Sequence, residues 1–274
     1  MPSIRSISSD KLFRRLGSEI SIIDVRSDSS APRHDHLLPA SIRRDAHNAA
    51  EWAPQFRDRS VVVACETGRE LSEGTAAWLR HAGADAELLE GGVAGWITAG
   101  YPMIPESALP PRDAEGRTVW VTRARPKVDR IACAWLIRRF VDPDAVFLFV
   151  SPSEVTSVAE RFSATPFDVE GVRWSHEGDR CTFDAMVAAF GLSGLEPLAY
   201  LATIVRGADT ARPDIVPEAA GLLALSLGLS RLYSDDLQQL EAGMPLYDAL
   251  YRWCRDARGE THDWTAHVAR GTRA

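Results

Sequence analysis

Over its first hundred residues the sequence alternates short β-rich runs with helical stretches, and this alternation constrains the fold more than any other feature. The β-rich runs are ISIIDV at 20–25, SVVVAC at 60–65 and AELLEG at 86–91. Helical patterns occupy residues 9–17, 48–56 and 72–82. Strands that alternate with helices along a chain form parallel sheets covered by helices. We therefore expect residues 1–103 to form an α/β domain, a parallel sheet flanked by helices.

The alternation stops at a proline-rich segment, YPMIPESALPPRDAEGR, in which no helix or strand period survives. We predict a linker at residues 104–116 and a second domain at 117–274. In that domain two strand-like runs, 117–122 and 145–150, bracket a helix at 129–140, and from residue 182 the pattern is almost entirely helical. The second domain is thus expected to be α+β and rich in helices.

Composition excludes several classes of protein. The 274 residues carry a formal charge of −7, without the basic excess that nucleic-acid binding usually requires. No apolar run approaches the roughly 20 residues of a membrane span, and the first 25 residues lack the order of a signal peptide. The four cysteines, 65, 133, 181 and 254, form no C-x-x-C pair. We expect a cytoplasmic protein with neither a nucleic-acid nor a membrane partner.

Cys65 raises the first functional question. It ends an apolar strand and opens the turn CETGRELS, which passes through Gly68 into a helix. The backbone N–H groups of such a turn, together with the helix N-terminus, lower a thiol pKa and bind anions. The alternative is a packed core thiol, which is the commoner state of a cysteine at the end of a strand.

Three further segments accompany this turn: IIDVR (22–26), HDHLLPASI (34–42) and LEGGVAGWITAGYPM (89–103). With the Cys-x-x-Gly loop they resemble the rhodanese sulfurtransferase family, in order and at similar spacing, over about residues 4 to 103. The residues at matching places are Asp24, Arg26, His36, Pro39, Gly91, Gly92 and Trp96. The resemblance implies a rhodanese fold.

The resemblance also implies that Cys65 accepts a sulfane sulfur as a persulfide from a small donor such as thiosulfate. The substrate anion would be cradled by the backbone amides of Glu66, Thr67, Gly68, Arg69 and Glu70. The sequence departs from the family at Glu70, where many single-domain members carry arginine. The stretch is also one residue longer, as in relatives that process phosphate or arsenate, but those relatives end the loop in arginine where this chain has Leu71.

The two acidic side chains of the loop bear on its chemistry. We expect Glu66 and Glu70 to repel an oxyanion and to raise the thiol pKa, with Arg69 partly offsetting them.

A basic turn precedes the helix predicted at 129–140. Arg123, Arg125, Lys127 and Arg130 crowd the entry of this helix, which Asp129 is placed to cap. Four cations at a helix N-terminus favour an oxyanion site for chromate or sulfate. The alternative is a solvated basic turn whose helix simply packs its apolar face inward.

Histidine and carboxylates gather further along the second domain. His176 and Asp184 lie near a predicted helix start, and Asp209 ends an apolar helix, where a carboxylate is unfavourable unless a cation answers it. We predict a mononuclear metal at His176, Asp184 and Asp209, for which Fe, Mn or Zn is suited. Cys181 is an alternative ligand, and Arg206 and Arg212 are alternative partners that would satisfy Asp209 without a metal.

Over about residues 117 to 258 the chain resembles the C-terminal domain of the chromate-resistance protein ChrB. The segments that carry this resemblance are 120–150, 171–192, 201–214, 219–233 and 242–256. The resemblance implies a role in chromate resistance or chromate-responsive regulation. Full-length ChrB proteins have a different N-terminal region, thought to bind DNA, so a rhodanese domain in that place argues against a transcriptional role.

Together these features predict a rhodanese-like sulfurtransferase, fused to a chromate-resistance domain, that acts in chromate or oxidant defence. Two alternatives remain open. One is an oxyanion sensor that binds chromate through Arg123–Arg130, and the other is a thiol-dependent oxyanion reductase that uses the longer loop.

Overall fold

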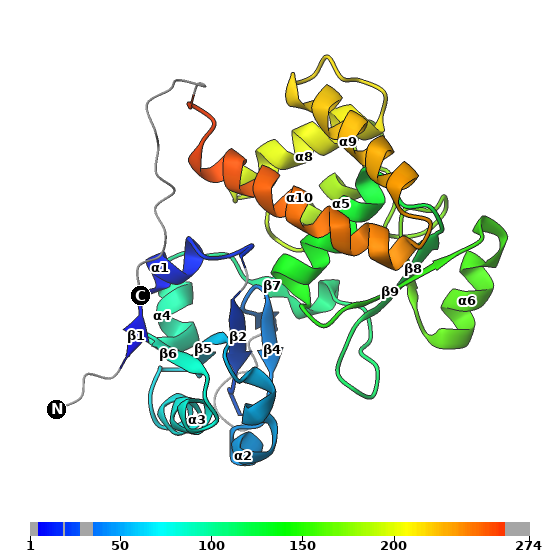
Figure 1. Cartoon of the computed structure of the whole chain (residues 1–274). Coiled ribbons are helices and arrows are strands. Elements are labelled where there is room, and N and C mark those ends of the chain that lie inside the picture. The colour runs from blue at the N-terminus through cyan, green and yellow to red at the C-terminus, as the bar shows by residue number, and fades with distance from the viewer. Residues whose placement is uncertain (1–4, 19, 28–34, 261–274) are drawn as a thin grey trace.

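The computed structural model describes residues 5–18, 20–27 and 35–260. The chain forms an N-terminal α/β part and a mostly helical C-terminal part, which lie against each other (Figure 1).

The N-terminal part is built on one parallel sheet of five strands in the order β1-β6-β5-β2-β4. The strands are β1 (Ser6–Ile7), β2 (Ser21–Asp24), β4 (Ser41–Arg43), β5 (Ser60–Ala64) and β6 (Asp85–Leu89). The predicted parallel α/β fold is confirmed, and three of these strands coincide with the β-rich runs to within two residues.

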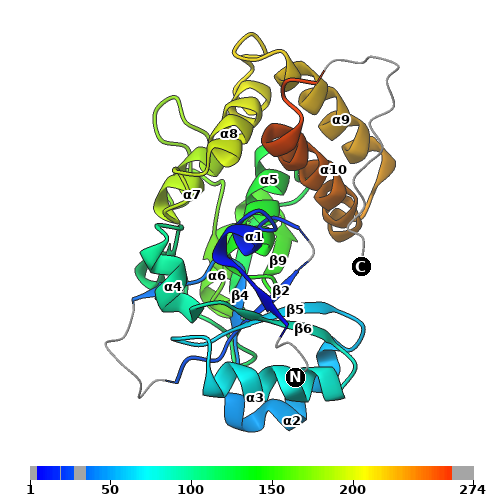
Figure 2. The ribbon, with the colours of Figure 1, turned by 90° about the vertical axis from the view of Figure 1, so that its left-hand side faces the viewer.

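Helices cover both faces of this sheet (Figure 2). They are α1 (Ser9–Phe13), α2 (Ala49–Trp52), α3 (Glu70–His81) and α4 (Gly92–Thr98), with 3₁₀ turns at Ala46–Asn48 and Ala53–Phe56. Val61 and Val63 of β5 belong to the core that contains α2 and α3, whereas Val62 belongs to the core on the other face. A strand that is buried on both faces does not alternate polar and apolar residues, which explains the unbroken apolar run before Cys65.

The predicted linker is packed rather than loose. Ile104–Pro105 forms β7, which pairs antiparallel with β3 (His36–Leu37), and a 3₁₀ turn follows at Glu106–Ala108. Ile104 and Ala108 are both buried. The expectation that residues 104–116 hold no strand is therefore wrong. Proline is tolerated in β7 because it lies in a two-residue edge strand.

The C-terminal part contains a second, smaller parallel sheet. β8 (Val119–Arg123) lies between β9 (Val146–Val150) and β10 (Thr165–Pro166). The helices are α5 (Asp129–Leu136), which continues as a π-helical turn at Ile137–Val141, α6 (Val155–Phe162), preceded by a 3₁₀ turn at Pro152–Glu154, α7 (Thr182–Ala189), α8 (Glu196–Asp209), α9 (Glu218–Leu232) and α10 (Asp236–Asp256). The expected helix-rich α+β architecture is confirmed.

The two parts share one hydrophobic core. Trp135 of the fully buried α5 packs against Phe183 and Tyr251, and the same cluster reaches Ile22 and Val62 of the first sheet. The Ala40 amide donates to the Phe140 carbonyl at 2.7 Å across the junction.

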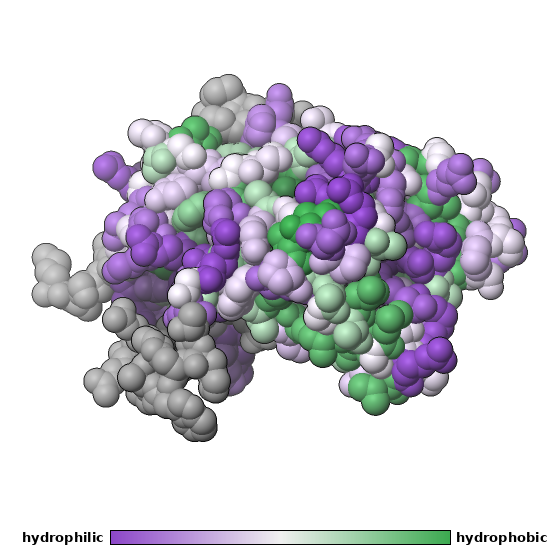
Figure 3. Space-filling view, turned by 90° about the horizontal axis from the view of Figure 1, so that it is seen from above, coloured by the Kyte–Doolittle hydropathy of each residue, from purple (hydrophilic) through white to green (hydrophobic). Residues whose placement is uncertain are grey.

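Hydrophobic residues are interspersed with hydrophilic ones over the face seen in Figure 3. Within the described ranges, no helix is both long and apolar enough to cross a membrane.

Candidate functional site

Cys65 lies directly after β5, at the carboxyl edge of the first sheet. β5 and β4 flank β2 on opposite sides, so the strand order reverses between β2 and β5. Open parallel sheets bind their ligands outside the carboxyl ends of strands at such a switch point. The cysteine therefore occupies the position of the sheet where a ligand is most expected.

The loop directs hydrogen-bonding groups at the sulfur. Sγ lies 3.1 Å from the Ser72 hydroxyl and 3.6 Å from the Arg69 carbonyl oxygen. Burial, the largest single influence, raises the pKa of Cys65, but hydrogen bonds from the Ser72 hydroxyl and from the amides of Ser72, Arg69 and Thr67 together lower it below its usual value. The lowered pKa agrees with the expected effect of the loop amides, and neither Glu66 nor Glu70, which we expected to oppose it, is among its main causes.

Two glycines hold the loop in place. The Val93 amide, at the start of α4, donates to the Cys65 carbonyl at 2.9 Å, and the next amide along α4 donates to the Glu66 carbonyl. This approach requires Gly92, since a Cβ there would lie 2.4 Å from the Cys65 oxygen and 2.5 Å from the Gly68 nitrogen. Gly92 also has a φ of +61°, a backbone conformation that residues other than glycine rarely adopt.

A buried ion pair supports the neighbouring strand. Asp24, at the end of β2, is fully buried and accepts a 2.6 Å hydrogen bond from Arg26. Arg26 also donates to the His36 carbonyl at 3.2 Å, which ties the segment before β4 to the edge of the sheet. Asp24, Arg26 and His36 thus hold the backbone of this segment in place, and the side chain of His36 is exposed.

The side chains of the predicted cradle lie mainly at the surface. Thr67, Arg69 and Glu70 are exposed, while Glu66 and Gly68 are partly buried. Glu70 is the first residue of α3, so the helix begins two residues earlier than predicted. Whether this loop binds a substrate anion remains a prediction.

The four cations predicted as an oxyanion site do not converge. Arg125 turns away to donate to the carbonyls of Tyr233 and Ser234 beyond α9, and its amide donates to Asp236. Arg123 and Arg130 both reach the same carboxylate of Asp168, at 3.2 and 2.8 Å. Lys127 is exposed. The chain turns at Arg125, where φ is +59°, so the neighbouring side chains contact different partners.

A second group of polar residues surrounds the N-terminus of α7. Asp129, which was expected to cap its own helix, is the first residue of α5 and is 1% exposed. Its carboxylate accepts the amides of Thr182 and Phe183 at 2.8 and 2.9 Å. Asp129 therefore caps a helix 53 residues further along the chain.

Asp168 completes the inner part of this group. It is buried, follows β10, and accepts from Thr182 Oγ1 at 3.1 Å in addition to the two arginines. Nothing in the local sequence marks Asp168, since its role depends on β10 pairing with β8.

His176 lies at the centre of the group. Its Nε2 is 3.5 Å from Asp129 Oδ2, 3.4 Å from Asp168 Oδ1 and 3.3 Å from Asp209 Oδ2. These carboxylates, Asp129 foremost, raise the pKa of His176 to about 9 against the opposing effect of burial. Burial first, and then repulsion by Asp129 and Asp168, raises the pKa of Asp209 to about 6.

The structure corrects the predicted ligand set. Asp184 pairs with Arg206 at 2.8 Å and accepts the Cys181 amide at 3.1 Å, so it is occupied elsewhere. In the described part of the chain, the ligand atoms of Asp129, His176 and Asp209 lie within 4.8 Å of one another. Asp129 thus takes the place that we had given to Asp184. Burial, with Asp129 and Asp184 nearby, raises the pKa of Cys181, which argues against a thiolate ligand.

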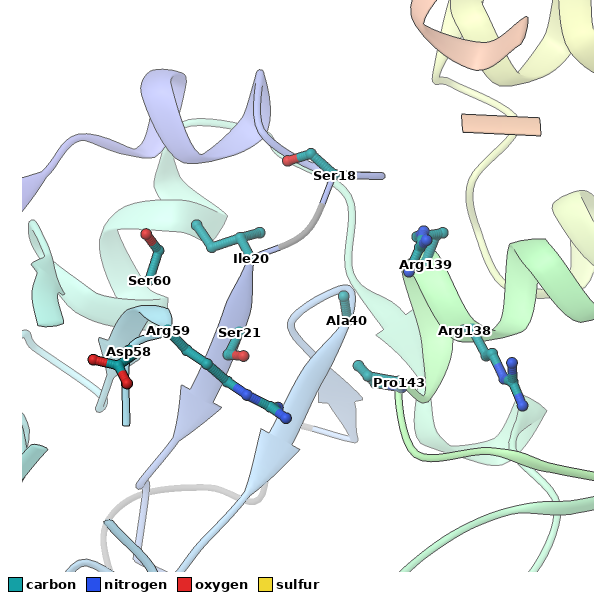
Figure 4. A pocket seen from close by; sticks show the side chains of 10 residues that line it. All are labelled: Ser18, Ile20, Ser21, Ala40, Asp58, Arg59, Ser60, Arg138, Arg139 and Pro143. Carbon is teal, nitrogen blue, oxygen red and sulfur yellow. The ribbon is translucent and has the colours of Figure 1, made fainter. Parts of the chain in front are cut away.

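A pocket between the two parts lies away from both sites. Its volume is about 470 Å³, and Ser21 and Ser60, which begin β2 and β5, line it together with Arg59, Arg138 and Arg139 (Figure 4). It therefore opens at the amino edge of the first sheet, opposite the edge that carries Cys65.

Comparison with known proteins follows the division seen in the fold. Residues 8–99 match the family described as rhodanese-like domain, and residues 120–254 match the family described as ChrB, C-terminal domain. The chain carries these two domains in sequence: a rhodanese-like domain followed by a ChrB C-terminal domain.

A curated relative and two solved structures are similar to parts of the chain. Protein ChrB of Cupriavidus metallidurans is 38% identical over 159 residues, which cover 57% of this chain and 47% of the relative. The chain therefore spans about half the length of the curated relative that it matches.

The solved structures resemble the N-terminal part. A rhodanese-related protein from Thermoplasma volcanium is 26% identical, with a TM-score of 0.31, over 37% of this chain and 99% of its own. A rhodanese-like domain protein from Staphylococcus aureus is 25% identical, with a TM-score of 0.30, over 34% of this chain and 90% of its own.

Proposed function

We propose that the chain is a sulfurtransferase that carries sulfane sulfur on Cys65. The observation that supports this most directly is the ring of hydrogen-bond donors around Sγ, which lowers the thiol pKa despite burial. A thiolate, rather than a thiol, is the form of cysteine that attacks sulfur.

Thiosulfate is a simple donor with which to write and test this chemistry. The Cys65 thiolate attacks the outer sulfur, a new S–S bond forms, and sulfite leaves with the electron pair of the bond that breaks. A nucleophilic acceptor, cyanide in an assay, then takes the terminal sulfur and returns the thiolate. The amides that stabilise the thiolate are placed to stabilise the persulfide anion as well.

The loop charges bear on the rate. Arg69 and the N-terminus of α3 favour a dianionic donor, whereas Glu66 and Glu70 oppose it. We expect turnover with thiosulfate to be slow, and an acidic loop of this kind is better suited to a donor of lower negative charge.

The second domain supports a role in chromate or oxidant defence, through its membership of the ChrB C-terminal family. An oxyanion sensor built on Arg123–Arg130 is a weaker candidate. Arg123 and Arg130 are engaged by Asp168, and Arg125 by carbonyl groups near α9. A thiol-dependent oxyanion reductase would use the same Cys65, and persulfide formation distinguishes the two.

Mass spectrometry of the intact protein after thiosulfate treatment tests the proposal. We expect a mass gain of one sulfur atom, mapped to Cys65, that cyanide removes with release of thiocyanate. Cys65→Ser should abolish it, whereas Cys254→Ser should not, because burial raises the pKa of Cys254 to about 12. A Cys65→Ser protein that retains thiosulfate:cyanide activity would refute the assignment.

A further inference from the structure

The second parallel sheet repeats the topology of the first. Its central strand, β8, has β9 on one side and β10 on the other, so the strand order also reverses here. Asp168 follows β10, and Asp129 begins the helix after β8. The group around His176 therefore lies at the carboxyl edge of a parallel sheet, at the switch point where such sheets bind ligands.

We propose that this group binds one divalent first-row transition-metal ion through His176 Nε2 and carboxylate oxygens of Asp129 and Asp209, whose ligand atoms lie within 4.8 Å of one another. The proposal concerns the C-terminal domain alone and does not depend on the chemistry of Cys65.

The distances around His176 fit metal coordination better than hydrogen bonding. Three carboxylate oxygens lie 3.3, 3.4 and 3.5 Å from the same nitrogen. A charge-assisted N–H···O bond would be about 2.7–2.9 Å, and one N–H points at only one acceptor. With metal–ligand bonds of about 2.1 Å, by contrast, two donors of a tetrahedral set lie about 3.4 Å apart.

The charge around the group calls for a cation. Asp168 is answered by Arg123 and Arg130, and Asp129 by two amides of α7. Asp209 lies 3.3 Å from His176 and accepts a hydrogen bond from the Asp129 amide, but among residues 5–18, 20–27 and 35–260 no arginine or lysine pairs with it. It also ends α8, where the helix dipole disfavours a negative charge.

The donor set indicates the class of ion. One imidazole and two carboxylates suit Mn²⁺, Fe²⁺ or Zn²⁺ and provide no thiolate to select softer ions. The side chain of His176 is 41% exposed and that of Asp209 is 22% exposed, whereas Asp129 and Asp168 lie beneath them. The ion would therefore be held from below and keep open positions toward solvent for an exchangeable ligand.

Elemental analysis and calorimetry on the untagged full chain test the proposal. We expect the protein, purified without chelator, to contain close to one equivalent of Mn, Fe or Zn. After the metal is stripped, Mn²⁺ and Zn²⁺ are each titrated into the protein. At least one of them should bind with a stoichiometry near one per chain.

Variants locate the site. His176→Gln and Asp209→Asn should each weaken binding at least about 100-fold. His47→Gln and Asp184→Asn are the matched controls and should bind as the wild type does, because His47 lies in a surface pair with Asp45 and Asp184 belongs to Arg206. Asp209→Asn should also leave the metal-free fold at least as stable, since it relieves carboxylate repulsion.

Two results would overturn the proposal. One is a wild-type protein that binds neither ion more tightly than the His176→Gln variant does. The other is an Asp209→Asn variant that binds metal normally while its metal-free form is less stable than the wild type, which would assign Asp209 to a simple ion pair with His176.

Discussion

Cys65 and Cys181 occupy similar places in the two domains, yet their thiols are opposite in character. Each is buried and each precedes a helix that begins near the carboxyl edge of a parallel sheet: Cys65 lies five residues before the first residue of α3, and Cys181 is the N-cap of α7. The pKa of Cys65 is lowered, although burial opposes this, by hydrogen bonds from Ser72 and from loop amides. The pKa of Cys181 is raised by burial and then by the Asp129 and Asp184 carboxylates.

The difference shows that a helix N-terminus does not by itself make a reactive thiolate. Around Cys65 the amides of Thr67, Arg69 and Ser72 are directed at the sulfur. At α7 the first amides are taken by Asp129, so the positive end of that helix stabilises a carboxylate instead. The same backbone feature thus accompanies a lowered thiol pKa in one domain and a buried, capped carboxylate in the other.

Alkylation tests this contrast most strongly. At pH 7 we expect iodoacetamide to modify Cys65 at least about 100-fold faster than Cys181, because only the thiolate reacts. Peptide mapping by mass spectrometry, with Cys65→Ser as the control, gives both rates in one sample. Equal rates in folded protein would mean that the loop amides do not activate Cys65.

Gly92 tests whether the loop geometry matters. Gly92→Ala places a Cβ against the Cys65 carbonyl and the Gly68 amide, and it strains a residue with positive φ. We expect sulfur transfer to fall at least about tenfold, since the donors around Sγ are displaced.

Gly74→Ala is the matched control for Gly92→Ala. Gly74 lies within α3 with open space around its Cα, so alanine there should stabilise the protein by about 0.5–1 kcal/mol. Unchanged sulfur transfer in Gly92→Ala, measured as thiocyanate release, would show that the loop tolerates displacement.

Asp129→Asn tests the arrangement at α7, where the first helix amides bind a carboxylate rather than a thiol. Asparagine has one acceptor oxygen where the carboxylate has two, so one helix amide would face an NH₂ donor, and we expect the metal-free protein to lose about 2–3 kcal/mol of unfolding free energy. Urea unfolding in the presence of chelator measures this. Asp235→Asn is the control, because Asp235 is an exposed N-cap of α10 that asparagine replaces well. Equal stabilities of the two variants would remove Asp129 from its capping role.

The sequence was sufficient for features that depend on neighbours along the chain. The strands around Cys65 follow from apolar runs, and Gly91 and Gly92 stand out as a pair in a family-like segment. The contact of Gly92 with the Cys65 carbonyl and the hydrogen bonding of Cys65 with Ser72 were not predicted, because no pattern of residue types reveals them.

The second site depends on pairings that no local pattern reveals. Asp129 acts on a helix 53 residues away, and Asp168 meets Arg123 only because β10 pairs with β8. The basic turn failed as a prediction for the same reason: adjacency in sequence says nothing about where Arg125 points once the chain turns. We predicted Asp184 as a metal ligand because it lies at a helix start. In the structure it forms an ion pair with Arg206, which lies one turn before the end of α8.

The smallest expected effect is a pH dependence of the metal-free protein that belongs to His176. Contact with Asp129 foremost, and with Asp209 and Asp168, raises the pKa of His176 from 6.5 to about 9. The folded state therefore holds this proton more tightly, so its stabilising effect is complete below about pH 6.5 and is lost as the pH rises through 9. Asp209, with a pKa of about 6, titrates mostly below this window. With chelator present, wild type should melt higher than His176→Gln at pH 6.5, and the two should converge by pH 9.5. Because the ring is 41% exposed, solvent screening keeps the difference to a few degrees. A constant difference across this range would show that packing of the ring, rather than its charge, stabilises the fold.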